Sequence, residues 1–286
     1  MRKISGLVLS LASALSVSTA LAAPLPVVAV NREVGLSMAG QFDNLVIGES
    51  DFYRSHPEGT YAGYQSLSHS ERRRIGWTPG FQVDASAMYS FWGVENLYAS
   101  AQFLLGQGNR NHKYRSDYMP NYGEYTPYSF GGSAASRSTY SRGEIGKGFL
   151  VLDSRFLLTP FIQGGYLTYG SSSFSGANSF FVGAGLNADY ALTDRLVLRG
   201  RFGWAQLLDT GFGFRSHGSS PRWEGGLGVD YRFTKRLHLT AGGDYAYTDY
   251  GHDTRRYNWF YGADEVLAGS AFQNGATLHV GLAYQY

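Results

Sequence analysis

The sequence contains no cysteine and, after residue 22, no long hydrophobic run. The missing cysteines exclude disulfide bonds and thiol chemistry, so stability must come from backbone pairing and packing. A transmembrane helix needs about 20 predominantly apolar residues, and no segment after residue 22 supplies them. If the chain lies in a membrane, it must cross as a closed barrel, because only helices and closed barrels satisfy every backbone group in lipid.

Excess charge is also scarce. The formal net charge is +2, and Arg2 and Lys3 account for all of it. A chain that is neutral beyond its first residues offers no basic surface for a nucleic-acid partner.

The N-terminus has the pattern of an export signal. Its positive start is followed by the apolar and small residues Ile4–Leu21, which serines interrupt, and Ala20-Leu21-Ala22 offers a cleavage site before Ala23. We therefore predict a signal peptide at residues 1–22 and a single mature domain at residues 23–286.

The most frequent pattern in the chain is the alternation of apolar residues with small or polar ones. Aromatic residues make up 16% of the chain, there are 38 glycines, and apolar residues recur at every second position over many segments. A period of two is typical of half-buried strands. Ten strands are predicted, near residues 34–47, 81–91, 97–105, 141–152, 158–169, 180–190, 196–204, 223–233, 237–247 and 277–286.

The connections between these strands alternate strictly between short and long. Bacterial outer-membrane barrels have an even number of strands, short periplasmic turns and longer extracellular loops. The sequence therefore predicts an all-β, ten-stranded antiparallel transmembrane β-barrel. Its long loops are expected at residues 48–78, 106–140, 170–179, 209–221 and 248–275.

The last ten residues, Thr277–Tyr286, carry apolar side chains at every second position and end on an aromatic. This strand resembles the closing strand of Gram-negative outer-membrane β-barrels, as does the Leu-Thr-Pro-aromatic opening at Leu158–Phe161. The resemblance, to small barrels of the surface-antigen or opacity-like type, implies three things. The protein lies in the outer membrane, it contacts lipids and lipopolysaccharide there, and the barrel-assembly machinery reads its C-terminal strand. The closing strand is expected to pair with residues near Val34–Phe42 so that no edge stays open.

The other faces of the strands carry charges of both signs, which predicts ion pairs across the lumen. Two interpretations follow: a barrel plugged by its own side chains, or a narrow polar pore. About eight strands already give an interior that side chains just fill, so the plugged interpretation is favoured. The lumenal residues are Asp84, Arg142, Glu144, Gln163, Asn187, Asp189, Arg199, Arg201, Arg222, Glu224, Asp230, Arg232, His238 and Asp244.

Lys147 disturbs the alternation. If its neighbours Ile145 and Phe149 face lipid, so does Lys147, at a cost of about 2 to 4 kcal/mol in mid-membrane. A bulge at Gly146 or Gly148 would turn it inward instead. The sequence leaves both orientations open.

Asp249, His252 and Asp253 lie close together in the last loop, where an acid and a histidine together activate water in the omptin proteases, which are also ten-stranded. The second pair of acids that such a site needs is missing, since Asp117 stands alone on the other loops. A metal site is a weaker hypothesis than catalysis, because no further histidine or carboxylate accompanies these three residues with diagnostic spacing. Residues 183–188 match a dinucleotide fingerprint only formally, because they lie within a strand. No catalytic, cofactor-binding or metal-binding residues are therefore predicted.

The loop predicted at residues 106–140 is rich in tyrosine, interleaved with basic residues. Such rings form adaptable recognition surfaces for a ligand or glycan, or pack on one another to order the loop; both interpretations stay open. The run Arg72–Arg74 is either a solvated basic segment or a contact for lipopolysaccharide phosphates. The aromatic residues are Tyr114, Tyr118, Tyr122, Tyr125, Tyr128, Phe130 and Tyr140.

These observations favour a non-enzymatic outer-membrane barrel with a plugged polar lumen and interacting loops. A small-solute channel and an omptin-like membrane hydrolase are the alternatives.

Overall fold

The computed structural model describes residues 25–55, 65–120, 126–171, 174–209, 220–259 and 263–286. The predicted signal peptide at residues 1–22 lies outside them. The described residues form one short helix, α2 (Pro26–Ala29), and eleven strands. The strands are β1 (Glu33–Ser55), β2 (Gln65–Phe91), β3 (Val94–Pro120), β4 (Thr126–Lys147), β5 (Phe149–Val151), β6 (Phe156–Ser171), β7 (Phe174–Ala191), β8 (Leu196–Leu207), β9 (Pro221–Arg232), β10 (Leu237–Trp259) and β11 (Ala263–Gln285).

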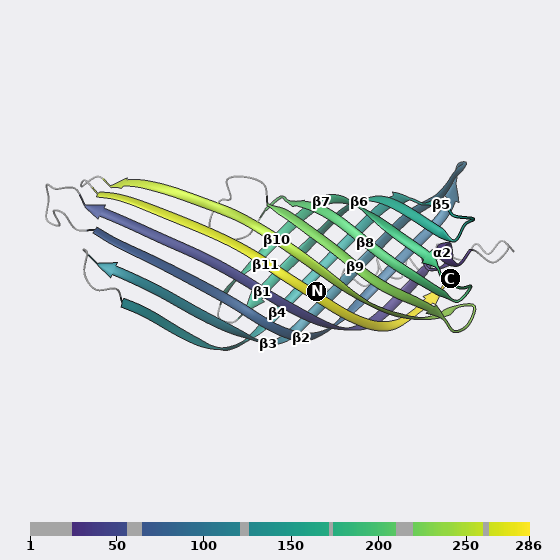
Figure 1. Cartoon of the computed structure of the whole chain (residues 1–286), viewed down its shortest axis with the longest axis horizontal. Helices are drawn as coiled ribbons and strands as arrows, with labels where there is room; N and C mark the ends of the chain where they lie inside the picture. Colours follow the sequence, from purple (N-terminus) through teal and green to yellow (C-terminus); the bar gives the residue numbers. More distant parts are fainter. Residues whose placement is uncertain (1–24, 56–64, 121–125, 172–173, 210–219, 260–262) are drawn as a thin grey trace, which may run out of the picture.

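The strands close into an antiparallel ring (Figure 1). The first and last strands pair with each other, with Val34 opposite Tyr284 and Phe42 opposite Ala276. The expected pairing of the C-terminal strand is therefore confirmed. The pairing of β4 with β6 completes the ring, so neither edge of the sheet stays open around the barrel.

The structure has eleven strands where ten are predicted, and the difference is one interruption. β4 and β5 both pair with β6, so they are two segments of one path along the wall. Between them, buried Gly148 leaves the ladder and its N–H donates to the Asn96 carbonyl (2.8 Å). Pro160 of β6 lies opposite this break, where its missing N–H costs no ladder hydrogen bond. Lys147 points outward, with its ammonium 5.2 Å from the centre of the Phe149 ring.

The predicted long loops are largely strand. β2 and β3 each run for 27 residues, whereas β8 and β9 have only 12. In Figure 1, β1, β2, β3, β10 and β11 continue far beyond the end of β8 and β9. Apolar residues do not recur regularly at every second position along these segments, so they lack the alternation that marks a strand in sequence. Their backbone groups nevertheless pair with a neighbour.

We call this part the extension: residues 44–55, 65–76, 107–120, 126–137, 248–259 and 263–274. Its strands lie in the order β4-β3-β2-β1-β11-β10. Pairing of β4 with β6 ends at Ser136, and pairing of β10 with β9 ends at Thr248. Beyond those residues, the described part of the chain forms a six-stranded sheet in which β4 and β10 are the outermost strands.

The barrel is apolar outside and polar inside. Outward side chains stay exposed, for example Met38 and Leu227 at 78% each, while inward Glu144 and Asp189 are buried. We call the outward apolar ring the belt; it includes Leu36, Met38, Val83, Phe103, Ile145, Ile162, Val182, Leu186, Phe202, Leu227, Leu237, Leu278 and Val280. Among the described residues, no helix is long and apolar enough to cross a membrane.

The segment before β1 fills one end of the lumen, which the sequence analysis does not anticipate. α2 lies at the end of the barrel that carries the short turns and the C-terminus (Figure 1). Val27, Val28 and Val30 pack there against inward side chains of the wall, including Leu157 and Val197. We call residues 25–33 the plug segment.

Candidate functional site

The lumen contains three layers of charged side chains, stacked between two apolar clusters. The central layer joins strands that are not neighbours in the ring. Glu144 of β4 lies 2.8 Å from Arg201 of β8, which lies 2.9 Å from Glu224 of β9. Arg142 contacts Glu144 (2.9 Å), and Arg222 contacts Glu224 (3.4 Å). The Glu144–Arg201 pair therefore crosses the lumen, while the other three pairs lie along one strand or between the neighbouring strands β8 and β9.

Hydroxyl groups complete the central layer. The Tyr98 hydroxyl donates to Glu144 (3.2 Å), and the Tyr140 hydroxyl donates to Glu224 (3.1 Å). Both carboxylates are nearly fully buried. A buried ion pair holds its geometry best when its remaining hydrogen-bonding positions are also satisfied, and these hydroxyl groups supply partners to both carboxylates.

The second layer lies toward the extension. Asp43 accepts from Arg74 (2.9 Å) and from the side chain of Gln273, and lies 3.3 Å from Arg110. Arg110 also donates to Ser136, whose hydroxyl lies at 3.1 Å. All of these residues are buried.

An apolar cluster covers this second layer on the side of the extension. Its buried inward members come from six strands: Leu45, Ile47, Leu167, Phe181, Ala205, Leu207, Tyr250 and Ala271. Tyr250 reaches it through a bulge at Gly251, which adopts a φ of +83°, and the Tyr250 hydroxyl donates to Gln273 (2.6 Å).

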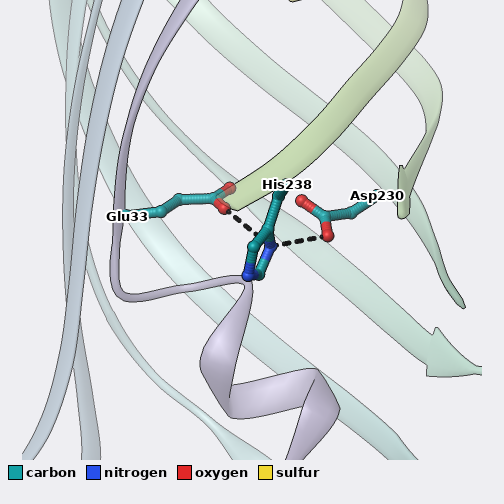
Figure 2. Close-up of side chains that lie close together, drawn as sticks. All are labelled: Glu33, Asp230 and His238. Carbon is teal, nitrogen blue, oxygen red and sulfur yellow. Dashed lines mark hydrogen bonds and ion pairs between the residues drawn. The ribbon is translucent and has the colours of Figure 1, made fainter. Parts of the chain in front are cut away.

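The third layer lies above the plug segment and holds Glu33, Asp189, Arg199, Asp230 and His238. Arg199 contacts Glu33 (2.9 Å) and Asp189 (3.3 Å). Figure 2 shows His238 of β10 pointing between Glu33 and Asp230, with Nδ1 2.8 Å from Asp230 Oδ1. The plug segment is tied to this layer, because the Asn31 amide donates to Asp189 (2.8 Å).

Two polar cavities separate the three layers. Their atom-free volumes, open mouths included, are about 740 and 910 Å³. Arg142 and Arg201 border both cavities, so the central layer divides the lumen between them.

The sequence prediction of paired lumenal charges is confirmed for Arg142, Glu144, Arg201, Arg222 and Glu224. It is also confirmed for Asp189, Arg199, Asp230 and His238 in the third layer. Gln163 accepts from Arg201, Asn187 donates to Glu144, Gln82 donates to Asp84, and Asp244 lies near His279. Arg232 is the exception, since it donates to the Asp194 carbonyl in a turn.

Asp249, His252 and Asp253 do not converge. His252 and Asp253 are consecutive and take opposite faces of the sheet, while the bulge at Gly251 places Asp249 and His252 on the same face. Asp249 accepts from the Gly251 N–H (2.8 Å), and buried Asp253 accepts from Arg255 (2.7 Å). Asp117 lies on β3, near Arg115 (3.4 Å).

The aromatic residues of the predicted second loop form two groups. Tyr114, Tyr128 and Phe130 pack together on neighbouring strands of the extension, with Tyr114 and Phe130 ring centres 5.2 Å apart. Tyr128 and Phe130 nevertheless stay at least half exposed. Tyr140 instead lies in the lumen and stacks on Phe181. Tyr118 is partly exposed, and Tyr122 and Tyr125 lie outside the described residues.

The run Arg72–Arg74 is split by strand alternation. Buried Arg74 binds Asp43 in the lumen, and Arg73 donates to Asn44 (2.8 Å). Arg72 lies near Glu49 (3.5 Å) and over the Tyr114 ring. The prediction of a solvated basic run is therefore wrong for Arg74, which is buried in the lumen, while Arg73, its neighbour in sequence, faces the other side of the sheet.

Sequence reasoning missed the lumenal role of Glu33, Asp43, Arg74, Arg110 and Gln273. Four of these lie in segments predicted as a strand start or loop. The alternation of the strand could have identified Asp43. Every second residue of a strand shares a face, and counting from Ser37 through Gln41 reaches Asp43.

No protein-family model matches the chain, and no curated protein matches it. Several solved structures are similar. The outer membrane protease OmpT from Escherichia coli covers 88% of this chain and 97% of its own, with 11% identity and a TM-score of 0.46. A FadL homologue from Pseudomonas aeruginosa covers 92% of each chain, with 12% identity and a TM-score of 0.37. The transport unit of the Escherichia coli autotransporter AIDA-I covers 98% of this chain and 97% of its own, with 11% identity and a TM-score of 0.35.

These three functions differ, and the similarity is too low to indicate which, if any, this chain performs. What the solved structures have in common is that they are β-barrels of the Gram-negative outer membrane.

Proposed function

We propose that this chain is a non-enzymatic protein of the bacterial outer membrane, closed along its lumen, that presents the extension to the outside of the cell for recognition. The observation that carries this proposal is the division of the same strands into a barrel with an apolar belt and an extension whose outward face is largely polar.

The belt supports membrane insertion. Side chains such as Met38, Ile145 and Leu227, from three strands of the ring, are each more than 60% exposed. A continuous apolar surface of this extent is far larger than soluble monomers expose, and lipid would cover it. The belt spans Leu97–Leu105 on β3, which fits the roughly 9 to 11 residues of a tilted transmembrane strand.

The orientation follows from the connections. Outer-membrane barrels place short turns in the periplasm and their longer parts outside. The turns at Trp92–Gly93 and Thr234–Arg236, the plug segment and the C-terminus would then face the periplasm. The extension would face the medium.

The lumen has features of a closed interior rather than a channel. A permeating ion would have to pass the cluster around Phe181 and Tyr250, the cross-lumen pair of Glu144, and the cluster around Val27. Apolar constrictions exclude water, and buried ion pairs cost much to separate.

Recognition is assigned to the concave face of the extension. Tyr128 and Phe130 expose their rings there, beside Tyr114 and Arg72. Aromatic rings beside a guanidinium suit stacking ligands such as glycans, and tyrosine provides contact area at a low cost in conformational entropy.

The absence of cysteine allows a direct test of exposure. Ser129→Cys in the extension and Lys235→Cys in a short turn are both at exposed positions. On intact cells, a membrane-impermeant maleimide is expected to label only Ser129→Cys, and to label both after lysis. Labelling of Lys235→Cys on intact cells, or recovery of the protein as a soluble periplasmic monomer, would contradict the proposal.

The closed lumen is tested in planar bilayers. Purified protein is expected to give no reproducible unitary conductance, and such conductance would establish the small-solute channel instead.

The hydrolase alternative is tested by substitution of the histidine in the extension. The His252→Ala variant is expected to leave any surface proteolysis unchanged.

Recognition is tested on a glycan array. The double variant Tyr128→Ala, Phe130→Ala should lose the binding that the unaltered protein shows. If the double variant and the unaltered protein bind the same glycans equally, the concave face of the extension is not the recognition surface.

A further inference from the structure

The third layer of the lumen brings together two carboxylates and a histidine from three strands. Glu33 ends the plug segment and begins β1, Asp230 lies on β9, and His238 lies on β10. Figure 2 shows both carboxylates directed at the imidazole ring. Nδ1 of His238 lies 2.8 Å from Asp230 Oδ1 and 3.5 Å from Glu33 Oε2. All three side chains are at most 3% exposed.

The layer contains more negative than positive charge. Glu33, Asp189 and Asp230 face a single guanidinium, that of Arg199, which contacts only the first two within ion-pair distance among the described residues. Asp230 is left with His238. A buried carboxylate without a positive partner is costly, so this position favours a bound cation.

Hydrogen-bonding capacity is also left over. Glu33 Oε2 and Asp230 Oδ2 are buried, and the structure gives neither a hydrogen-bond partner. Buried polar atoms are nearly always paired, and two such atoms beside one imidazole indicate a missing ligand.

The spacing fits a metal. One ligand atom from each of the three residues lies within 4.8 Å of the other two. A tetrahedral zinc with bonds of about 2.0 to 2.2 Å places neighbouring ligand atoms about 3.4 Å apart. The separations of 2.8 and 3.5 Å from Nδ1 bracket that value, so small side-chain shifts would complete the site.

We propose that Glu33, Asp230 and His238 bind a divalent transition-metal ion, with Zn²⁺ as the best match to an imidazole nitrogen and two carboxylate oxygens. The ion would join Glu33 of the plug segment to two strands of the wall. Metal binding would thereby fasten the plug segment in the periplasmic end of the lumen.

The test uses the full mature chain, folded in detergent and stripped with a chelator. Titration with ZnCl₂ is followed by calorimetry and by metal analysis of the desalted protein. One equivalent of Zn²⁺ per chain is expected. Glu33→Gln and Asp230→Asn should each weaken binding by more than about 100-fold, beyond the 10- to 100-fold loss typical of outer-shell partners.

The chain offers a matched control. His279 lies 3.5 Å from Asp244 in the same lumen but has no second carboxylate with it. His279→Ala should keep one equivalent of Zn²⁺ at unchanged affinity. The gel mobility of unheated samples shows whether each variant is folded.

Two outcomes would overturn the proposal. If the unaltered chain binds no Zn²⁺, Glu33, Asp230 and His238 do not form a metal site. If it binds Zn²⁺ but both substitutions leave the affinity unchanged, the metal binds elsewhere. As a second measurement, the visible absorption of a Co²⁺-loaded sample should disappear in Asp230→Asn and persist in His279→Ala.

Discussion

The barrel and the extension are built from the same strands, and they differ most on the outward face. Inward residues include polar and charged groups in both, such as Gln41 in the barrel and Glu49 in the extension, beside the apolar clusters. Outward residues change from Leu36 and Met38 in the belt to polar groups such as Ser50 higher on the same strand. Strand pairing thus continues past the belt, because backbone groups pair in water as well as in lipid.

Ion pairs differ in the same way between the two regions. Glu144 is buried among arginines, whereas Glu49 and Arg72 are each nearly half exposed. We expect Glu144→Gln to lower the free energy of unfolding by about 3 to 5 kcal/mol, because Arg142 and Arg201 lose a buried partner. Glu49→Gln should change it by less than about 1 kcal/mol. Urea unfolding of vesicle-reconstituted protein measures both, and equal effects would contradict the contrast.

Arginine substitutions on the outward face should have different effects on stability in the belt and in the extension. Val280→Arg, in the belt of β11, should cost about 2 to 4 kcal/mol in a bilayer. Ser270→Arg, exposed on the same strand within the extension, should be nearly neutral because water surrounds it. Folding yield into vesicles and unfolding midpoints report the difference. A neutral Val280→Arg would show that this part of β11 does not contact lipid.

The aromatic group of the extension should have a smaller, local effect. Tyr128→Ala removes ring contacts with Tyr114 and Phe130, each worth about 0.5 to 1.5 kcal/mol. Hydrogen exchange should speed up at the edge formed by β4 and its neighbour β3, while exchange around the belt stays unchanged. Slower exchange, or a change throughout the barrel, would mean that the two regions unfold together.

The smallest expected effect concerns Asp51, on the concave face of the extension. Burial raises the pKa of its carboxyl, and the Glu265 carboxylate raises the pKa further. Because the folded state then holds its proton more tightly than the unfolded state, stability falls as pH rises from the ordinary pKa to the raised one. Asp51→Asn should therefore stabilise the protein at neutral pH, by less than about 1 kcal/mol, and not in acid. The unfolding free energies of the variant and of the unaltered protein, measured at neutral and at acidic pH, test this expectation.

Much of the barrel was predictable because its signal is local. The alternation in Thr277–Tyr286 gave the closing strand, its outward face and its pairing partner. The extension was predicted as loop because neither of its faces is consistently apolar there, so nothing marks the period of two. The break at Gly148 needed the position of Pro160 on the neighbouring strand, although both residues are visible in the sequence.

Residue order alone settled which side chains share a face, because the strand repeat is two and the belt is apolar throughout. Ring closure decided everything that depends on contacts across the lumen. It pairs β1 with β11, which also pairs with β10, and so brings Glu33 within reach of His238. The four-residue helix α2 is too short to show a period, and it has a place only once the wall around it is complete. Lumenal chemistry is therefore a property of the closed ring, since its partners lie on strands far apart along the chain.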